Sequence, residues 1–180
     1  MKTKLLILPA LFILMLTQET SAQNIGGVTD VKGMNFLNVG IGLGTYGLSG
    51  TGGVPLTASF EHGFTKNISA GVGIGYVQRK YVSSWKYTYF LFGARGSYHL
   101  NETLKLANDK LDVYAGLGLL YRRYSFKYTE DNHEDLNSSG GDVDFEIHAG
   151  ARYFFNEKLG GFAEVGYGIS PLQLGLAVKL

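Results

Sequence analysis

The chain alternates apolar residues with polar or small ones in segment after segment, and this pattern constrains its fold more than any other feature. The last nine residues show it without interruption, because Leu172, Leu174, Leu176, Val178 and Leu180 are separated by polar or small residues. Alternation with period two gives a β-strand one apolar face and one polar face. Helical spacing of apolar residues is sustained nowhere in the chain. We therefore predict an all-β fold.

Eight such segments are separated by turn signals. They span residues 33–46, 55–64, 68–81, 86–100, 111–129, 142–155, 159–169 and 172–180. The alternation slips at Arg122 and Arg123, which predicts a β-bulge there. Short turns are expected at 65–67 and 156–158, and longer loops at 47–54 and 130–141. The chain has 26 glycines but 3 prolines, which favours a continuous sheet with tight turns.

The first 22 residues differ from the rest of the chain. Lys2 and Lys4 precede an uncharged, largely apolar stretch at 5–16, and Thr20, Ser21 and Ala22 form a small-residue cleavage site. This pattern predicts a secretory signal peptide at 1–22, followed by a short leader at 23–32 and a barrel domain at 33–180. The apolar stretch is shorter than the roughly 20 residues that a membrane-spanning helix needs.

Overall charge and cysteine content exclude some classes of protein. The 16 basic and 15 acidic residues nearly cancel, so nucleic acid is not suggested as a partner. The chain has no cysteine, so an exported form must be held together by hydrogen bonds and burial instead of disulfides.

Two architectures fit eight alternating strands: a lipocalin-like soluble barrel with its apolar faces inward, and a membrane barrel with its apolar faces outward. The polar faces favour the second. They carry charges of both signs in equal number, interleaved with small residues that would let large side chains pack in a narrow lumen. We therefore predict an eight-stranded antiparallel up-and-down transmembrane β-barrel. Its predicted lumen charge network comprises Glu61, Arg79, Arg95, Asp112, Arg122, Asp144, Glu146, His148, Arg152, Glu164 and Lys179.

The aromatic residues near the strand ends also favour a membrane barrel, because such rings concentrate at the two interfaces of a bilayer. We expect an outer girdle that includes Tyr76, Trp85, Tyr87 and Tyr121.

Several stretches resemble a known family. Gln173, Gly175, Val178 and Leu180 resemble the C-terminal assembly signal of bacterial outer-membrane β-barrels, although that signal usually ends in an aromatic residue. Together with residues 150–155 and 159–168, the closing strand resembles the small porin-like or PorT-like outer-membrane barrels, which share the architecture of OmpX and the OmpA transmembrane domain. The resemblance covers residues 33–180. It implies a place in the outer membrane, contact with its lipid and lipopolysaccharide, and insertion by the barrel-assembly machinery. It supplies no catalytic residues.

Two groups of residues suggest chemistry, and for each we favour a plainer interpretation. His148 shares a face with Glu146, but no serine is expected on a common rim with it, so we predict a protein that is not an enzyme. An external loop carries Asp131, His133, Glu134 and Asp135, which could hold a divalent cation. Because their spacing does not match a calcium loop, we expect a solvated loop, with no metal and no cofactor.

The leading hypothesis is a structural, adhesive or envelope-interaction role for a barrel whose lumen is closed by the charged network. One alternative is a narrow porin-like channel for small solutes. A second alternative is a soluble periplasmic barrel that binds an apolar ligand. The sequence indicates no particular surface ligand.

Overall fold

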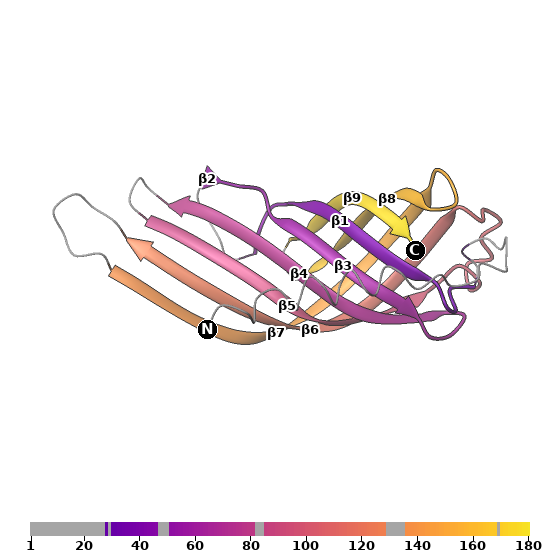
Figure 1. Cartoon of the computed structure of the whole chain (residues 1–180), viewed down its shortest axis with the longest axis horizontal. Helices are drawn as coiled ribbons and strands as arrows, with labels where there is room; N and C mark the ends of the chain where they lie inside the picture. The colour runs from indigo at the N-terminus through magenta and orange to yellow at the C-terminus, as the bar shows by residue number, and fades with distance from the viewer. Residues whose placement is uncertain (1–27, 29, 47–50, 82–84, 129–135, 169) are drawn as a thin grey trace, which may run out of the picture.

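The alternating segments form the strands of an antiparallel β-barrel (Figure 1). The computed structural model describes residues 28, 30–46, 51–81, 85–128, 136–168 and 170–180. Its strands are β1 (Asn35–Leu43), β2 (Thr51–Gly52), β3 (Leu56–Gly63), β4 (Ile68–Tyr81), β5 (Trp85–His99), β6 (Leu111–Tyr128), β7 (Leu136–Phe154), β8 (Leu159–Tyr167) and β9 (Leu172–Lys179). In this part of the chain, no helix has the length and apolar character needed to cross a membrane.

Each long strand pairs antiparallel with two neighbours. The order β4-β3-β1-β9-β8-β7-β6-β5 closes on itself, because β5 also pairs with β4. The seam between the two ends of the chain is made by β1 and β9, from Phe36 opposite Lys179 to Leu43 opposite Leu172. The two-residue strand β2 pairs only with the end of β4. The predicted eight-stranded antiparallel barrel is confirmed, and its closure satisfies the backbone groups that hydrocarbon would leave unpaired.

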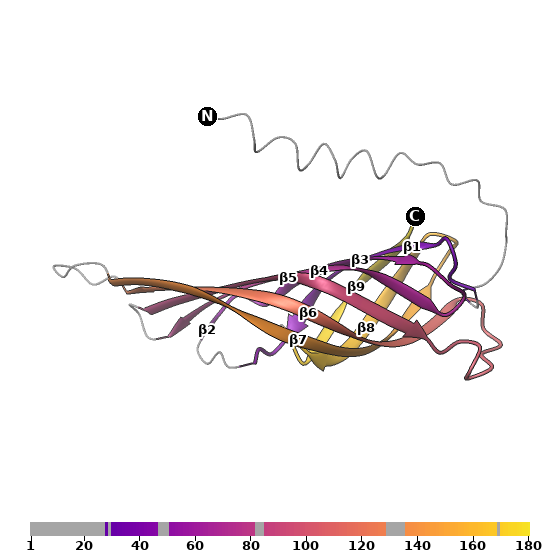
Figure 2. The same ribbon diagram turned by 90° about the horizontal axis from the view of Figure 1, so that it is seen from below.

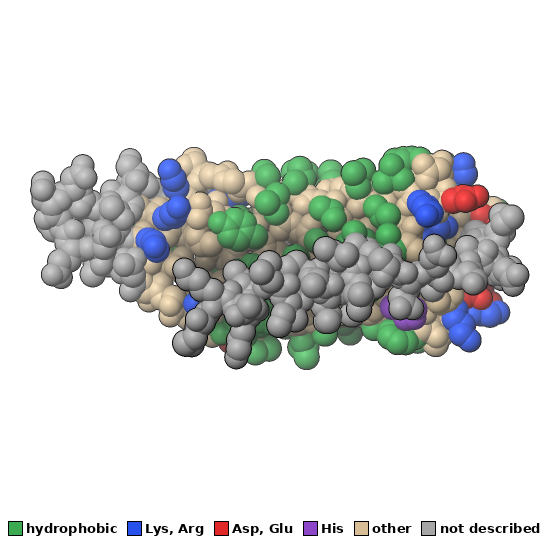
Figure 3. All heavy atoms as spheres, viewed as in Figure 1, with side chains coloured by type: hydrophobic (Ala, Val, Ile, Leu, Met, Phe, Trp, Pro, Cys, Tyr) green, Lys and Arg blue, Asp and Glu red, His purple; other side chains and the backbone are tan. Residues whose placement is uncertain are grey.

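The apolar faces of the strands point outward. Val143 is 68% exposed and Leu176 55%, whereas Arg95 is 7% and Glu146 6% exposed. On the face seen in Figure 3, hydrophobic side chains cover the middle of the barrel, between charged side chains at its two ends. A soluble container would have the opposite arrangement, so the hypothesis of a periplasmic barrel with an apolar interior is wrong.

Four strands continue past one end of the barrel, the end toward the predicted external loop, which is here called the outer end; the opposite end is called the inner end. Pairing of β3 with β4 ends at Tyr76, and pairing of β7 with β8 ends at Ile147. Beyond these points β4, β5, β6 and β7 remain paired with one another as far as Tyr81, Trp85, Tyr128 and Leu136. Figure 1 shows them projecting to the left of β1, β3, β8 and β9, and Figure 2 shows the same projection from a second side.

Three sequence predictions are corrected in this region. The loop predicted at 130–141 is shorter, because β7 begins at Leu136 and pairs with β6 from there. The loop predicted at 47–54 contains the short strand β2. The β-bulge predicted at Arg122 and Arg123 is absent, since these residues lie opposite Asp142 and Gly141 in an unbroken register.

The predicted outer aromatic girdle is partly wrong. Tyr76 and Tyr121 are outward and exposed, and Phe90 lies opposite Tyr76 between them. Trp85 and Tyr87 share the parity of Arg95 on β5 and therefore lie on the inward face of the projecting sheet. Both of these rings contact Phe126, at centroid distances of 4.6 and 4.9 Å.

The end of the predicted leader packs against the inner mouth of the barrel. Val28 and Val31 are buried, and they belong to an apolar cluster with Phe36, Phe154 and Phe162. The backbone N–H of Val28 donates to the carbonyl of Asp109 at 3.0 Å, and that of Val31 donates to Lys66 at 3.0 Å. The predicted signal peptide at 1–22 and residues 23–27 of the leader lie outside the described residues.

A closed ring of strands predicts heat-modifiable migration on a denaturing gel. We expect the unheated, detergent-extracted protein to run faster than the boiled protein, because a barrel without an open edge binds less dodecyl sulfate while it remains folded. Electrophoresis of paired heated and unheated samples measures this. Identical migration at every temperature would contradict the closed barrel.

Candidate functional site in the barrel interior

Arg95 connects carboxylates from three other strands across the lumen. Its Nε lies 2.9 Å from Glu61 Oε1 on β3, and its Nη1 lies 3.1 Å from Glu146 Oε1 on β7. Its Nη2 lies 2.7 Å from Glu164 Oε2 on β8. All four side chains are almost completely buried. Because the planar guanidinium can donate in several fixed directions, a single arginine joins strands that are not neighbours in the sheet.

Arg152 forms a second centre nearer the inner end of the lumen. Its side chain is fully buried, and its Nη1 lies 2.7 Å from Asp112 Oδ2. Its Nε donates to Asn38 Oδ1 at 3.1 Å. The guanidinium carbon lies 4.1 Å from the ring centroid of Tyr114 and 4.7 Å from that of Phe36. Arg152 is thus held by both ionic and cation–π contacts.

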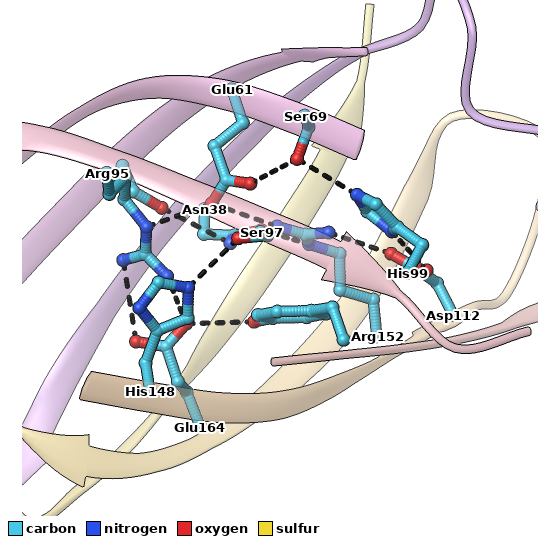
Figure 4. A network of polar contacts seen from close by, with 12 residues as sticks. Asn38, Glu61, Ser69, Arg95, Ser97, His99, Asp112, His148, Arg152 and Glu164 are labelled. Carbon is cyan, nitrogen blue, oxygen red and sulfur yellow. Dashed lines mark hydrogen bonds and ion pairs between the residues drawn. The ribbon is translucent and has the colours of Figure 1, made fainter. Parts of the chain in front are cut away.

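Glu61 joins the two centres. Its Oε1 lies 2.9 Å from Arg95 and 3.6 Å from Arg152, and its Oε2 accepts a hydrogen bond from Ser69 at 2.6 Å. Figure 4 shows these groups pointing toward one another within the barrel. The structure therefore brings seven of the predicted charged or titratable residues into one connected set, here called the interior network: Glu61, Arg95, Asp112, Glu146, His148, Arg152 and Glu164.

Two histidines extend the network through serines. His99 lies 2.9 Å from Ser69 Oγ through Nε2 and 2.7 Å from Asp112 Oδ1 through Nδ1. His148 Nε2 lies 2.9 Å from Ser97 Oγ, and its Nδ1 lies 3.4 Å from Glu146 Oε1. The sequence led us to expect no serine on a common rim with His148, and the serine that does contact it, Ser97, lies with it in the buried interior.

Neither serine has the environment of a catalytic nucleophile. Both serine–histidine pairs are closed to solvent, and the hydrogen bond of Ser69 also points the wrong way. Ser69 and His99 are 0% exposed, and Ser97 and His148 are at most 3% exposed. Ser69 also donates its hydroxyl proton to Glu61, so this hydroxyl is not directed at the histidine that would have to accept its proton.

The strand register places a glycine beside the large side chains of the network. Tyr114 lies opposite Gly150, and His148 lies opposite Gly116. A Cβ on Gly150 would come within 2.7 Å of the Tyr114 hydroxyl, and one on Gly116 would overlap the His148 ring. The inward glycines thus provide the space that a narrow lumen requires.

The other four predicted members lie away from the seven. Arg122 and Asp144 form their own ion pair at the outer end, where both are partly exposed. Arg79 is half-buried on the inward face of β4, opposite Tyr87. Lys179 lies at the inner end, with its Nζ 5.2 Å from the Phe154 ring centroid.

Sequence reasoning missed several uncharged partners. Tyr114 donates to Glu164 Oε2 at 3.0 Å, and Gln173 donates to Glu164 Oε1 at 3.2 Å. Asn101 donates to Asp112 Oδ1 at 2.9 Å. The strand residues among these partners share the inward parity of the charged residues, and that parity was the available signal. Their specific contacts depend on register across strands distant in sequence.

Little space remains inside the network. A cavity of about 30 Å³ lies beside Arg95, lined by polar groups that include Ser59, Glu146 and Gln173. That volume suits about one or two water molecules. Among the described residues, no group of three or more His, Asp or Glu side chains is arranged to hold a metal ion. The predicted loop residues Asp131, His133, Glu134 and Asp135 lie outside the described part of the chain.

The four positions of the predicted assembly signal all lie on or just after β9. Gln173 reaches Glu164, whereas Leu180 is 43% exposed at the inner end. Gly175 lies opposite Gly40 at the barrel seam, where a Cβ would overlap the Val39 carbonyl. Val178 is half-buried.

Comparison with solved structures identifies the same fold in outer-membrane proteins. The N-terminal β-barrel domain of Pseudomonas aeruginosa OprF has a TM-score of 0.52 at 15% identity, with 83% of this chain and 98% of that chain covered. Ail, the attachment invasion locus protein of Yersinia pestis, in complex with the heparin analogue sucrose octasulfate, has a TM-score of 0.52 at 12% identity over 82% and 95%. Neisserial surface protein A has a TM-score of 0.51 at 14% identity over 82% and 94%. No family model and no curated protein sequence matches the chain. The chain thus has the fold of the small outer-membrane β-barrels.

Replacing Arg152 by leucine should destabilise the barrel by about 3–5 kcal/mol, because the buried Asp112 would lose its arginine and the buried Glu61 would keep only Arg95. Denaturant unfolding of the protein in lipid vesicles measures the change. Arg122→Leu is the matched control, since it breaks a partly exposed pair and should cost about 0–1 kcal/mol. Equal losses in the two variants would contradict a special role for the buried centre.

Proposed function

We propose that this protein is an integral outer-membrane barrel with a structural, adhesive or envelope-interaction role, and that the interior network closes its lumen. The observation that carries this proposal is the position of Arg95, which is bonded at once to strands β3, β7 and β8. These strands lie on different sides of the ring, so the contacts cross the lumen instead of lining it. A passage for solutes would require several buried ion pairs to separate.

The small size of the remaining cavity supports closure over conduction. The cavity of about 30 Å³ beside Arg95 has room for about one or two water molecules, which is too little for a nutrient molecule. Moving Glu61, Glu146 or Glu164 aside would leave a buried charge without its partner, at a cost of several kcal/mol. The narrow porin-like channel is therefore the weaker alternative, and conductance separates the two.

Burial also argues against catalysis. Ser69 and Ser97 contact histidines, but no substrate could reach them without dismantling the network around Glu61 and Glu146. A structural role explains the same contacts, because Ser69 joins Glu61 to His99 and Ser97 adds a hydrogen bond to His148 within a buried polar network.

The projecting strands β4–β7 offer the surface for recognition. They extend past β1, β3, β8 and β9, at the end of the barrel opposite the turn between β7 and β8 (Figure 1). The loop with Asp131, His133, Glu134 and Asp135 follows β6 at this end and would add to that surface. Ail, an attachment protein by name, has the same fold and was solved with a heparin analogue. We further propose that outer-membrane lipid, lipopolysaccharide and the barrel-assembly machinery are partners, the last through Gln173, Gly175, Val178 and Leu180.

Planar-bilayer recordings test closure directly. We expect purified wild-type protein to show no large, steady conductance, because the guanidinium contacts block the lumen. The variant Glu146→Ala/His148→Ala, which removes a side chain that lines the cavity together with its neighbour in the network, should show more frequent openings. A stable open channel formed by the wild type would favour the porin-like alternative.

A fluorophosphonate probe tests the absence of an active serine. We expect the folded protein to remain unlabelled at Ser69 and Ser97, because both hydroxyls are buried. Intact mass before and after exposure measures labelling, and a known serine hydrolase serves as the positive control. Stoichiometric labelling that is lost in Ser97→Ala would overturn the non-enzymatic assignment.

A further inference from the structure

The charges on the outward face of the barrel have one sign and gather at one end. Among the described strand residues of outward parity, the Lys and Arg side chains are Lys80, Lys86, Arg123 and Lys127, and none of the residues is Asp or Glu. All four cationic side chains are exposed. Figure 3 shows basic side chains at the projecting end, whereas basic and acidic side chains are mixed at the inner end.

Three of these residues form a row across adjacent strands. Lys80 on β4 lies directly opposite Lys86 on β5, and Lys86 lies directly opposite Lys127 on β6. Paired residues on neighbouring strands have Cβ atoms about 5 Å apart, and like charges in such pairs repel. None of the ion pairs among the described residues involves this lysine row. The row is therefore unfavourable by itself, and a bound anion would relieve the repulsion.

Protection of an open sheet edge does not explain the row. Lysines often serve that purpose on edge strands. Here β5 and β6 are interior strands of the projecting sheet, and the end of β4 is covered by β2, which pairs with Arg79 and Lys80. The strand with the open edge is β7, and its residues Ser138–Gly141 carry no lysine.

The height of the row fits the headgroup layer of a bilayer. Lys80 follows the girdle residue Tyr76 by four positions on the same face, which is about 13 Å along the strand. With strands tilted by about 45°, the row lies about 9–10 Å beyond the girdle. The polar headgroup region extends roughly 5–8 Å beyond the hydrocarbon on each side, within reach of a lysine side chain at that height. Arg123, opposite Phe90, lies at the level of the girdle itself.

We propose that Lys80, Lys86 and Lys127, with Arg123 below them, bind the phosphate groups of anionic lipid headgroups in the outer leaflet. The lysine row lies on the same outward face as the lipid-facing side chains, so its ligands approach from the side, where lipids are. This inference rests on the proposed function, because it requires the barrel to be embedded with β4–β7 at the outer surface. It adds the binding residues and the chemical group that they recognise.

The test uses the full-length protein and compares two variants. Each variant loses three positive charges, one at the outer end of the barrel and the other at the inner end. The row variant is Lys80→Gln/Lys86→Gln/Lys127→Gln. The control is Lys32→Gln/Lys110→Gln/Lys158→Gln, which changes three exposed lysines at the inner end. Each protein, folded in dodecyl maltoside, is titrated with phosphatidic acid, phosphatidylglycerol or phosphatidylcholine. Emission of Trp85, the single tryptophan and the neighbour of Lys86, reports binding, and native mass spectrometry counts retained lipids.

We expect the wild type to prefer phosphatidic acid over phosphatidylglycerol, and both over phosphatidylcholine, in the order of the net negative charge of the headgroup. Each lysine near an anionic surface contributes about a fivefold gain in affinity. The affinity for the anionic lipids should therefore fall about 100-fold in the row variant and less than threefold in the control. Equal losses in both variants would overturn the inference, since only bulk charge would matter. Binding of inorganic phosphate or heparin to the row without any lipid preference would overturn it in favour of a soluble anion.

Gel migration of the same samples separates the two proposals. If the wild type is not heat-modifiable, the membrane barrel itself fails. If both wild type and row variant are heat-modifiable and yet bind the three lipids alike, only the lysine row loses its role.

Discussion

The structure depends on two buried arginines that share one carboxylate. Arg95 and Arg152 both contact Glu61, and through it the outer and inner halves of the lumen become one network. Buried ions are tolerated only where each has partners with good geometry, because desolvation costs several kcal/mol per ion. The barrel meets this condition by supplying carboxylates from four strands, β3, β6, β7 and β8, together with uncharged groups such as Tyr114 that satisfy remaining acceptors. The closed ring holds these strands at fixed separations, so the barrel and its network stabilise each other.

The need to fit this network into a narrow lumen accounts for the high glycine content. A lumen of eight strands is just wide enough for side chains, so a large residue on one strand needs a small one beside it. Glycines meet this need opposite Tyr114 and His148, and at the seam Phe162 lies over the paired glycines Gly40 and Gly175. A Cβ on either seam glycine would lie within 3.0 Å of the Phe162 ring. Glycine in a strand normally weakens it, and here the loss is offset because an aromatic ring covers the exposed backbone.

Much of the fold could be predicted from the sequence, since alternation identifies both the strands and the face that each residue occupies. β4 was predicted with its observed bounds. The beginning of β7 was missed because Ser138, Ser139, Gly140 and Gly141 have the composition of a turn, and only pairing with β6 makes them a strand. Arg123 suggested a bulge because it interrupts the apolar face of β6. It in fact keeps the outward parity, and the outward face becomes polar from Arg123 onward because β6 leaves the apolar middle of the barrel there. For the interior, parity indicated which residues point inward, but the contact of Arg95 with Glu164 joins residues on strands that are not neighbours. Such contacts follow from the closure and register of the ring, which no local pattern encodes.

A filled lumen restricts where this protein can interact with anything else. Because the interior network leaves room for little more than one or two water molecules, binding partners must be met at the lipid-facing wall or at the two ends. At the inner end Val28 and Val31 cover the mouth through backbone bonds to the turns, so little of the interior is accessible there. The outer end differs, since β4–β7 continue there as a sheet that is open along β7 and presents separate aromatic and basic faces. The parts of β4–β7 beyond Tyr76 and Ile147 lie outside the closed ring, and a role in recognition, as proposed for the projecting sheet, would account for this extra length.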